Sequence, residues 1–220
     1  PSYVSKAGKK TDHVGRFWSG CASAVKHGLE LLGIAVVDAD VKDAMMLRAE
    51  LTHNASELKA RKMNLTDWYL HVLDKYKPEL LKITSLMVAD AAFSTLPFVS
   101  GLKELGFDLV SRFRSNAVLF YIYDGPRTGK RGRPKTVDGK IDFANPDKSR
   151  MTRIDIDREE GRAYELIAWS KSLKRKVRLV IWYKPDGSHK LFFCTDVNVC
   201  GKDVFDIYRT RFQIEFCYRD

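Results

Sequence analysis

Apolar residues are spaced differently in successive parts of the chain, and the spacing predicts which parts form strands and which form helices. The run from Gly28 to Val37 (GLELLGIAVV) is typical of a buried strand, and Ala44–Leu51 is the candidate for its neighbour. From Asn64 to Ile83 the apolar residues follow a helical spacing. Pro78 lies inside this stretch and predicts a kink or a break in the helix.

A strand, a helix and a second strand are predicted next, in that order. The segment SLMVADAAF is a short apolar run that contains a single acid, Asp90. In the following segment, Ser94 or Thr95 can cap a helix whose first turn accommodates Pro97. Gly106 suits the left-handed end of that helix. The run FDLVSRF then predicts a strand, so the order favours a βαβ unit with parallel strands.

The pattern then changes to β structure. Val118–Tyr123 is strand-like, and Asp124–Arg150 is predicted to be a polar loop that contains Gly and Pro. Arg178–Tyr183 and Lys190–Thr195 flank the sequence PDGS, which predicts a hairpin. We therefore expect mostly β structure inserted into an α/β core.

The final stretch, Asp203–Asp220, has no Gly or Pro and predicts a helix with a polar stripe. Tyr208, Arg211 and Glu215 are spaced three and four residues apart, which places them on one helical face. The opposite face carries aromatic residues that can anchor it to a core: Phe205, Phe212 and Phe216. The alternative interpretation is a structural Arg–Glu pair with a tyrosine above it.

Asp90 is the other acid of interest, because it ends a predicted strand. Open α/β sheets bind ligands at the carboxyl ends of their strands, although the same position also suits a helix cap or a turn. Cleavage of a phosphodiester needs an activated nucleophile and a stabilised leaving oxygen, and two divalent ions held by carboxylates provide both. Asp90 and Glu215 are candidate ligands for such ions, and a third carboxylate is expected.

The charge of the chain favours a polyanionic partner. The formal net charge is +10, and phosphates neutralised by basic side chains release counterions. The run KRGRPK at 130–135 resembles an AT-hook, whose arginines enter a narrow minor groove; the alternative is a solvated basic loop. A second cluster is either a DNA contact or an exposed strand face: Lys171, Lys174, Arg175, Lys176 and Arg178.

Cysteine usage and hydropathy exclude several classes of protein. The four cysteines form neither a CxxC pair nor a zinc spacing with the five histidines, which indicates reduced thiols in a cytosolic protein. A zinc site through Cys194 and Cys200 is the alternative. No stretch approaches the roughly 20 apolar residues of a membrane span, and the first ten residues lack the apolar run of a signal peptide.

Several of these segments together resemble the DDE transposases of bacterial insertion sequences, in the group with a β-strand insertion before the final Glu. VADAAFS at 88–94 is similar to the second-Asp segment of that group. YRTRFQIEFCYRD at 208–220 fits its Y-(2)-R-(3)-E-(6)-K signature through Tyr208, Arg211 and Glu215. SYVSKAGKKT at 2–11 and RFWSG at 16–20 resemble the stretch that follows the first Asp.

The resemblance implies that the sequence is a fragment. The group's first Asp is expected immediately before Pro1, and its signature lysine is expected two residues after Asp220. Asp12, Asp38 and Asp40 rank low as internal substitutes for that Asp, because the family places it ahead of the GKKT stretch. Since one metal ligand is expected to be missing, we expect this fragment to be inactive or nearly so.

The resemblance also implies a fold and an activity. The fold is an RNase H-like α/β core interrupted by a mostly β insertion, divided into 1–115 (first part of the core), 116–197 (insertion with the basic loop) and 198–220 (final helix). The implied activity is metal-dependent strand cleavage at the terminal inverted repeats, followed by attack of the released 3′-hydroxyl on target DNA. Two Mg²⁺ ions, with Mn²⁺ as a substitute, are expected at Asp90 and Glu215.

The implied partner is double-stranded DNA, bound by a homodimer that holds paired ends in the bacterial cytoplasm, in association with the nucleoid. The residues expected to contact DNA are Tyr208, Arg211, Lys9, Lys10, Lys130, Arg131, Arg133 and Lys135. Alternatives are a metal-dependent nuclease on the same fold, a DNA-binding remnant of a decayed element, and a basic protein whose acids are structural.

Overall fold

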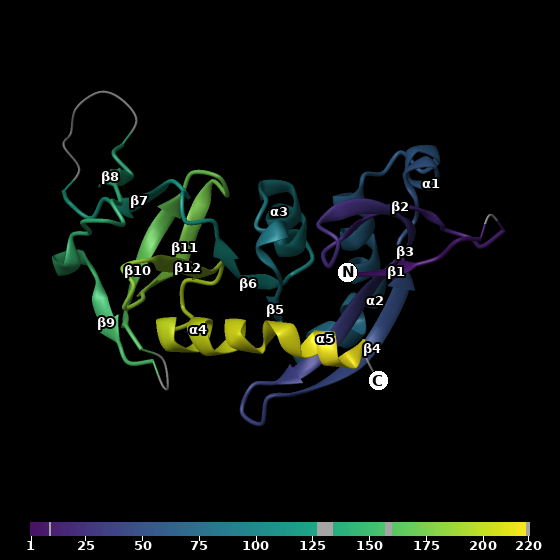
Figure 1. The fold of residues 1–220 in the computed structure, drawn as a ribbon. Coiled ribbons are helices and arrows are strands. Elements are labelled where there is room, and N and C mark those ends of the chain that lie inside the picture. The colour runs from purple at the N-terminus through teal and green to yellow at the C-terminus, as the bar shows by residue number, and fades with distance from the viewer. Residues whose placement is uncertain (9, 127–133, 157–159, 219–220) are drawn as a thin grey trace. The chain divides into compact units, whose positions relative to one another are not determined.

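The computed structural model describes residues 1–8, 10–126, 134–156 and 160–218, and the chain divides into two compact units (Figure 1). The first unit comprises Pro1–Ile83 and Thr210–Asp220, and the second comprises Thr84–Arg209. Each unit contains its own sheet together with helices. The predicted mixed α/β fold class, with an RNase H-like core, is therefore confirmed.

The first unit is built around one long strand, β3 (Ala24–Asp38). Three shorter strands pair with it in antiparallel register: β1 (Ser2–Ser5), β2 (Gly15–Ser19) and β4 (Asp43–Leu51). Alternate residues of β3 are buried, as the period of two in a strand requires: Gly28, Glu30, Leu32 and Ile34. The predicted strand at 28–37 and its predicted neighbour at 44–51 are both confirmed.

Two helices follow β4 in the first unit, α1 (Ala55–Ala60) and α2 (Leu65–Ile83). The buried residues of α2 recur at helical spacing: Trp68, Tyr69, Val72, Leu73 and Leu80. The helix continues through Pro78, so the predicted break does not occur. Proline removes one backbone hydrogen bond from a helix, but the buried face on both sides of Pro78 holds the two halves in one element.

The second unit contains a mixed sheet in the order β5-β6-β12-β11-β10-β7-β8, with β9 also paired to β10. Its strands are β5 (Leu86–Val88), β6 (Asp108–Phe113), β7 (Leu119–Ile122), β8 (Val137–Lys140), β9 (Thr152–Ile154), β10 (Arg162–Ser170), β11 (Arg175–Tyr183) and β12 (His189–Cys194). β5 and β6 are parallel and are joined through the 3₁₀ helix η1 (Ala91–Phe93) and α3 (Leu96–Glu104). This confirms the predicted βαβ unit.

The β-rich part of the chain extends the same sheet, because β12 pairs antiparallel with β6. The predicted hairpin is present between β11 and β12, with Gly187 at a φ of +80° in its turn. The expected polar loop at 124–150 is partly wrong, since it contains β8 and the 3₁₀ helix η2 (Lys148–Arg150). Ile141 explains part of this difference: its side chain is 1% exposed, and its N–H donates to the Leu119 carbonyl at 2.9 Å.

The end of the chain is not the single α-helix that its composition predicts. It forms α4 (Gly201–Arg209), the 3₁₀ helix η3 (Thr210–Gln213) and α5 (Ile214–Cys217). Phe205 is buried against the sheet of the second unit, whereas Phe212 and Phe216 are 45% and 47% exposed. A 3₁₀ turn has three residues per turn instead of 3.6, so it rotates the faces that follow it. The expected anchoring by all three phenylalanines is therefore wrong for two of them.

The apolar core of the second unit joins the sheet to α4. Its buried members are Val110, Ala163, Val180, Trp182, Phe192, Cys194, Val204 and Phe205.

None of the helices in the described residues is long and apolar enough to span a membrane. The division at residues 115/116 and 197/198 stays a prediction.

Candidate functional site

Asp90 lies two residues after the end of the parallel strand β5. The Ala89 N–H continues the strand ladder by donating to the Val110 carbonyl at 3.1 Å. Asp90 has extended backbone angles and caps η1, with its Oδ1 accepting a hydrogen bond from the Ala92 N–H at 3.2 Å. Asp90 is exposed to solvent. The carboxylate therefore combines the two roles weighed for it, a helix cap and an acid at the carboxyl end of a parallel strand.

The backbone of Asp90 is held by a serine of the neighbouring strand. Ser111 on β6 is fully buried, and its hydroxyl donates to the Asp90 carbonyl at 3.1 Å. Ser94 lies 2.9 Å from the same hydroxyl and donates to the Arg112 carbonyl at 3.0 Å. These contacts fix the turn that carries Asp90 relative to β6.

Glu215 lies in the first turn of α5, in the first unit. An Arg211 guanidinium nitrogen donates to its carboxylate at 3.4 Å, and the Glu215 side chain is 58% exposed. Tyr208 belongs to the second unit, where its ring packs on Phe192 with the centroids 5.1 Å apart. The structure thus brings Arg211 and Glu215 together and places Tyr208 against the core.

The residues expected to bind DNA differ in what the structure shows of them. Lys10 is exposed. Lys135 forms an ion pair with Asp138 at 2.5 Å and lies over the Tyr123 ring at 4.6 Å from its centroid. The remaining four lie outside the described residues: Lys9, Lys130, Arg131 and Arg133.

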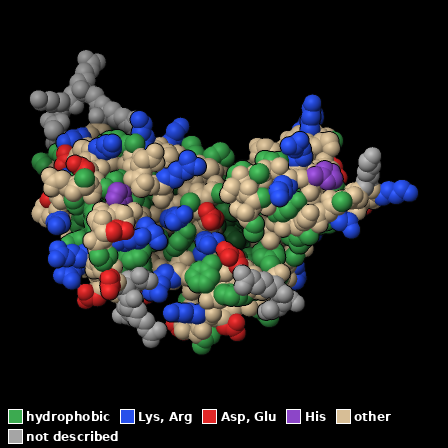
Figure 2. Space-filling view, viewed as in Figure 1, with side chains coloured by type: hydrophobic (Ala, Val, Ile, Leu, Met, Phe, Trp, Pro, Cys, Tyr) green, Lys and Arg blue, Asp and Glu red, His purple; other side chains and the backbone are tan. Residues whose placement is uncertain are grey.

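The second basic cluster separates into structural arginines and exposed lysines. Arg178 donates to the Val197 carbonyl at 2.6 Å and pairs with Glu165 at 3.4 Å. Arg175 donates to the Ser100 hydroxyl at 3.0 Å. The exposed members are Lys171, Lys174 and Lys176. On the face shown in Figure 2, lysine and arginine side chains are more widespread than acidic ones.

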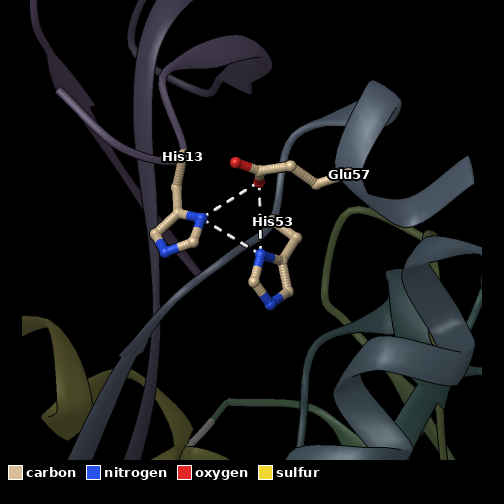
Figure 3. A group of neighbouring side chains, drawn as sticks. All are labelled: His13, His53 and Glu57. Atoms are coloured by element: carbon tan, nitrogen blue, oxygen red, sulfur yellow. Dashed lines mark hydrogen bonds and ion pairs between the residues drawn. The ribbon is translucent and has the colours of Figure 1, made fainter. Parts of the chain in front are cut away.

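A cluster that the sequence analysis did not identify joins His13, His53 and Glu57 in the first unit (Figure 3). The His13 Nδ1 lies 3.0 Å from the Glu57 Oε2 and 3.0 Å from the His53 Nδ1. The His53 Nδ1 lies 3.2 Å from the same Glu57 oxygen. Within the described part of the chain, this is the group of His, Cys, Asp and Glu side chains whose atoms lie close enough to share a cation.

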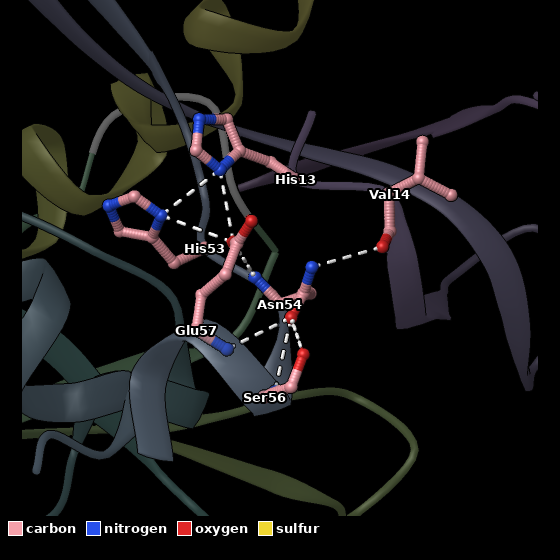
Figure 4. Close-up of polar contacts among 6 residues, drawn as sticks. All are labelled: His13, Val14, His53, Asn54, Ser56 and Glu57. Atoms are coloured by element: carbon pink, nitrogen blue, oxygen red, sulfur yellow. Dashed lines mark hydrogen bonds and ion pairs between the residues drawn. The ribbon is translucent and has the colours of Figure 1, made fainter. Parts of the chain in front are cut away.

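The start of α1 positions the acid of this cluster (Figure 4). Asn54 caps the helix by accepting from the backbone N–H groups of Ser56 and Glu57, each at 3.1 Å. The Glu57 carboxylate accepts from the Asn54 N–H at 2.9 Å, which completes a capping box. Burial opposes ionisation of Glu57, but the hydrogen bonds from His13, Asn54 and His53 outweigh it and lower the pKa of the carboxyl.

The sequence carried only part of the signal for this cluster. Asn54 followed three residues later by Glu57 is a capping-box pattern, and His53 precedes it directly. His13 is separated from His53 by 40 positions. No local spacing relates the two histidines, so a search for zinc motifs passes over them.

The cysteines are free thiols: Cys21 and Cys200 are exposed, Cys217 is half-buried and Cys194 is buried. Burial raises the pKa of the Cys194 thiol to about 12. Since the thiolate is the form that binds zinc, this burial disfavours the alternative zinc site at Cys194 and Cys200.

Comparison with known proteins gives one family. A family model described as DDE superfamily endonuclease matches residues 2–176. The match includes Asp90 and its segment at 88–94 but ends before Tyr208, Arg211 and Glu215. A search of curated proteins found no match.

Proposed function

The chain belongs to the DDE superfamily of endonucleases, and from this membership we propose that it is the catalytic part of a transposase that cleaves and joins DNA at the ends of an insertion sequence. The family supports nuclease or transposase chemistry in general. The observation that carries the proposal is Asp90, an exposed acid two residues after the end of a parallel strand and within the matched residues.

The donor atoms at the proposed ligands suit magnesium. Asp90 and Glu215 both present carboxylate oxygens on exposed residues, and hard oxygen atoms are the ligands that Mg²⁺ prefers. Two Mg²⁺ ions, with Mn²⁺ as a substitute, would supply an activated nucleophile and stabilisation of the leaving oxygen. Ser111 holds the backbone of Asp90, and Arg211 orients the Glu215 carboxylate.

Arginine can bind phosphate as well as carboxylate, so Arg211 is also a proposed contact to the DNA backbone. The other proposed contacts are Tyr208, Lys9, Lys10, Lys130, Arg131, Arg133 and Lys135. Lys10 has the stronger support of the two described lysines, because the charge of Lys135 is partly neutralised by Asp138. Three exposed lysines of the second unit are further proposed contacts to DNA: Lys171, Lys174 and Lys176.

We further propose the substrates, the assembly and the domain division that go with this activity. The substrates are the terminal inverted repeats and a target duplex, and a homodimer holds the paired ends in the bacterial cytoplasm, on the nucleoid. Residues 116–197 are the β insertion of the family group, between a first core segment at 1–115 and a last one at 198–220.

The test uses the natural full-length chain and the ends of its own element. Nicking and strand transfer are measured with Mg²⁺ or Mn²⁺ for the parent, Asp90→Asn and Glu215→Gln, beside a DNA-binding assay. Asp206→Asn is the matched control, because Asp206 is a solvent-facing acid of α4 paired with Lys202 at 3.3 Å. We expect both ligand variants to bind DNA without cleaving it, and the control to keep its activity.

Three outcomes would replace the proposal. Cleavage that persists in Asp90→Asn or Glu215→Gln removes that residue from the metal site. A parent that nicks DNA but cannot join a pre-cleaved end to target DNA is a nuclease, and a parent that only binds DNA is a remnant of a decayed element.

A further inference from the structure

The cluster of His13, His53 and Glu57 has an arrangement that hydrogen bonding alone does not explain. Three atoms, the two Nδ1 nitrogens and the Glu57 Oε2, lie 3.0, 3.0 and 3.2 Å from one another. Each Nδ1 carries either one proton or one lone pair, so it makes one good hydrogen bond. At most two of the three contacts can therefore be hydrogen bonds. A cation in contact with all three lone pairs accounts for the whole triangle.

The size of the triangle fits a transition-metal ion. The three distances place the atoms on a circle with a radius of about 1.8 Å, so an ion at about 2.0–2.2 Å from each lies about 1 Å out of their plane. This is the position of a metal held by three protein ligands with coordination left open on one side. The His13 and Glu57 side chains are 28% and 32% exposed, which leaves a route from solvent.

Two segments of the first unit, the turn before β2 and the start of α1, hold the donor atoms in place before any ion binds. His13 lies in the turn before β2 with a φ of +64°, in the left-handed region that non-glycine residues seldom occupy. His53 is 8% exposed, and its ring packs edge-on against Trp68 with the centroids 4.2 Å apart. Glu57 is oriented by the capping box with Asn54. The side chains would therefore lose little conformational entropy when an ion binds, which favours binding.

The surroundings of the cluster also contain polar groups without a partner. The Trp68 indole Nε1 and the Thr52 hydroxyl are buried and have no hydrogen-bond partner within the described residues. Trp68 packs on His53, and Thr52 precedes it in the chain. Buried donors of this kind are seldom left unpaired, and a bound water is a suitable acceptor for either.

We propose that His13, His53 and Glu57 bind one zinc-type transition-metal ion and so tie the turn before β2 to the start of α1. Imidazole nitrogen selects zinc, cobalt, nickel or copper, whereas Mg²⁺ prefers oxygen ligands alone. The site therefore differs in residues and in metal from the carboxylate pair proposed for DNA cleavage, and it stands or falls independently of that chemistry.

The first experiment titrates the metal-free full chain with Zn²⁺ and, in parallel, with Co²⁺ as a spectroscopic probe. With Mg²⁺ present in excess to fill the proposed carboxylate site, we expect one ion per chain, with the visible absorption of low-coordinate Co²⁺ and without a thiolate charge-transfer band. Zinc-edge X-ray absorption of the parent should show nitrogen and oxygen ligands, including two imidazoles. An excess of Mg²⁺ should not displace the bound ion.

The matched variants are His13→Gln and Glu57→Gln, with His27→Gln as the control. His27 is an exposed histidine of the same unit that contacts the Lys6 carbonyl at 3.2 Å, outside the cluster. Glutamine at position 57 can still accept from the Asn54 N–H, so the capping contact survives. We expect the two cluster variants to lose at least about 100-fold in Zn²⁺ affinity and the control to lose none.

Several results would overturn the proposal without depending on how the variants fold. These are no Zn²⁺ or Co²⁺ binding by the parent, a thiolate band in its Co²⁺ spectrum, or a coordination shell without imidazole. Unchanged affinity in folded His13→Gln and Glu57→Gln chains would also overturn it, and the cluster would then be a hydrogen-bonded structural contact.

Discussion

Glu57 in the first unit and Asp90 in the second occupy similar local positions, at the start of a helical segment, but different side chains and backbone groups surround them. Each lies at the start of a helical segment, Glu57 in the first turn of α1 and Asp90 as the cap of η1. Two imidazole nitrogens lie within 3.2 Å of Glu57, whereas Asp90 accepts from the Ala92 N–H and follows a parallel strand. The donor atoms that other segments bring to an acid, and not its local position at the start of a helix, therefore decide which cation that acid can bind.

The largest expected effect separates the two acids by activity. We expect Asp90→Asn to lower strand cleavage at least about 1,000-fold, because the loss of a metal ligand removes several kcal/mol of transition-state stabilisation. The same variant should bind Zn²⁺ as the parent does. Glu57→Gln should show the reverse pattern, with weak Zn²⁺ binding and retained cleavage. Parallel cleavage assays and Zn²⁺ titrations check this, and a joint loss of both properties in either variant contradicts it.

The next effect concerns stability. At a free Zn²⁺ concentration of 100 times the dissociation constant, binding to the native state alone raises the free energy of unfolding by about 2.7 kcal/mol. We expect this gain for the parent and for His27→Gln, and no gain for His13→Gln. Mg²⁺ should not produce this stabilisation, because we do not expect it to bind at His13, His53 and Glu57. Urea unfolding with Zn²⁺ and with a chelator measures the difference, and equal stabilisation of His13→Gln argues against the site.

A third prediction tests how Asp90 is positioned. Ser111→Ala removes the hydroxyl that donates to the Asp90 carbonyl, and we expect cleavage to fall about tenfold as the carboxylate loses its alignment. Ser170→Ala is the control, since Ser170 is also fully buried in the same sheet and its hydroxyl contacts Leu173 and Ser172 instead. Both variants should lose about 1–2 kcal/mol of stability. Equal activity in the two would show that Ser111 has only a structural role.

A fourth prediction compares the two caps. Asn54→Ala should lower the free energy of unfolding by about 1 kcal/mol, because α1 loses the acceptor for its first N–H groups. Asp90→Asn should cost little stability, since asparagine caps a helix about as well as aspartate. Urea unfolding curves give both values. Asn54→Asp keeps a cap acceptor and should lose less than Asn54→Ala; an equal loss would mean that the contact from Asn54 to the Val14 carbonyl dominates.

The smallest effect is a dependence on pH within the first unit. Hydrogen bonds from Lys75 and then Tyr76 lower the pKa of Glu50 below its ordinary value of 4.5. A lowered pKa means that the stabilisation is complete above pH 4.5 and is lost as the pH falls towards the pKa of the folded state. Glu50 and Lys75 are partly exposed, so we expect the charged Glu50 to contribute less than about 1 kcal/mol to the free energy of unfolding.

Unfolding of the parent and of Glu50→Gln from pH 7 to pH 3 measures this contribution. The difference in stability should be constant near neutral pH and should shrink in acid. A difference that grows in acid would show that Glu50 is destabilising in its charged form.

The sequence predicted the elements around Asp90 well, because each signal is local. A short apolar run, a proline in a first turn and a glycine at a helix end are read within a few residues, and β5, α3 and β6 followed as expected. The prediction of a single final helix was wrong because contacts distant in the sequence decide how this segment folds. Its composition favours a helix throughout, but Phe205 is buried in the second unit while α5 contacts β3 and β4 in the first. A 3₁₀ segment separates the two parts.

The sequence by itself determined the strand and helix periodicities, the basic charge and the membership in the DDE superfamily, because all of these are properties of residue order. Only the tertiary structure decided which distant side chains meet. His13 reaches His53 and Glu57 because strand pairing in the first unit brings the turn before β2 to the start of α1. Arg178 is a candidate DNA contact by sequence, and strand pairing in the second unit places it against Glu165 and the Val197 carbonyl. Contacts of this kind depend on how the strands pair, which no local pattern encodes.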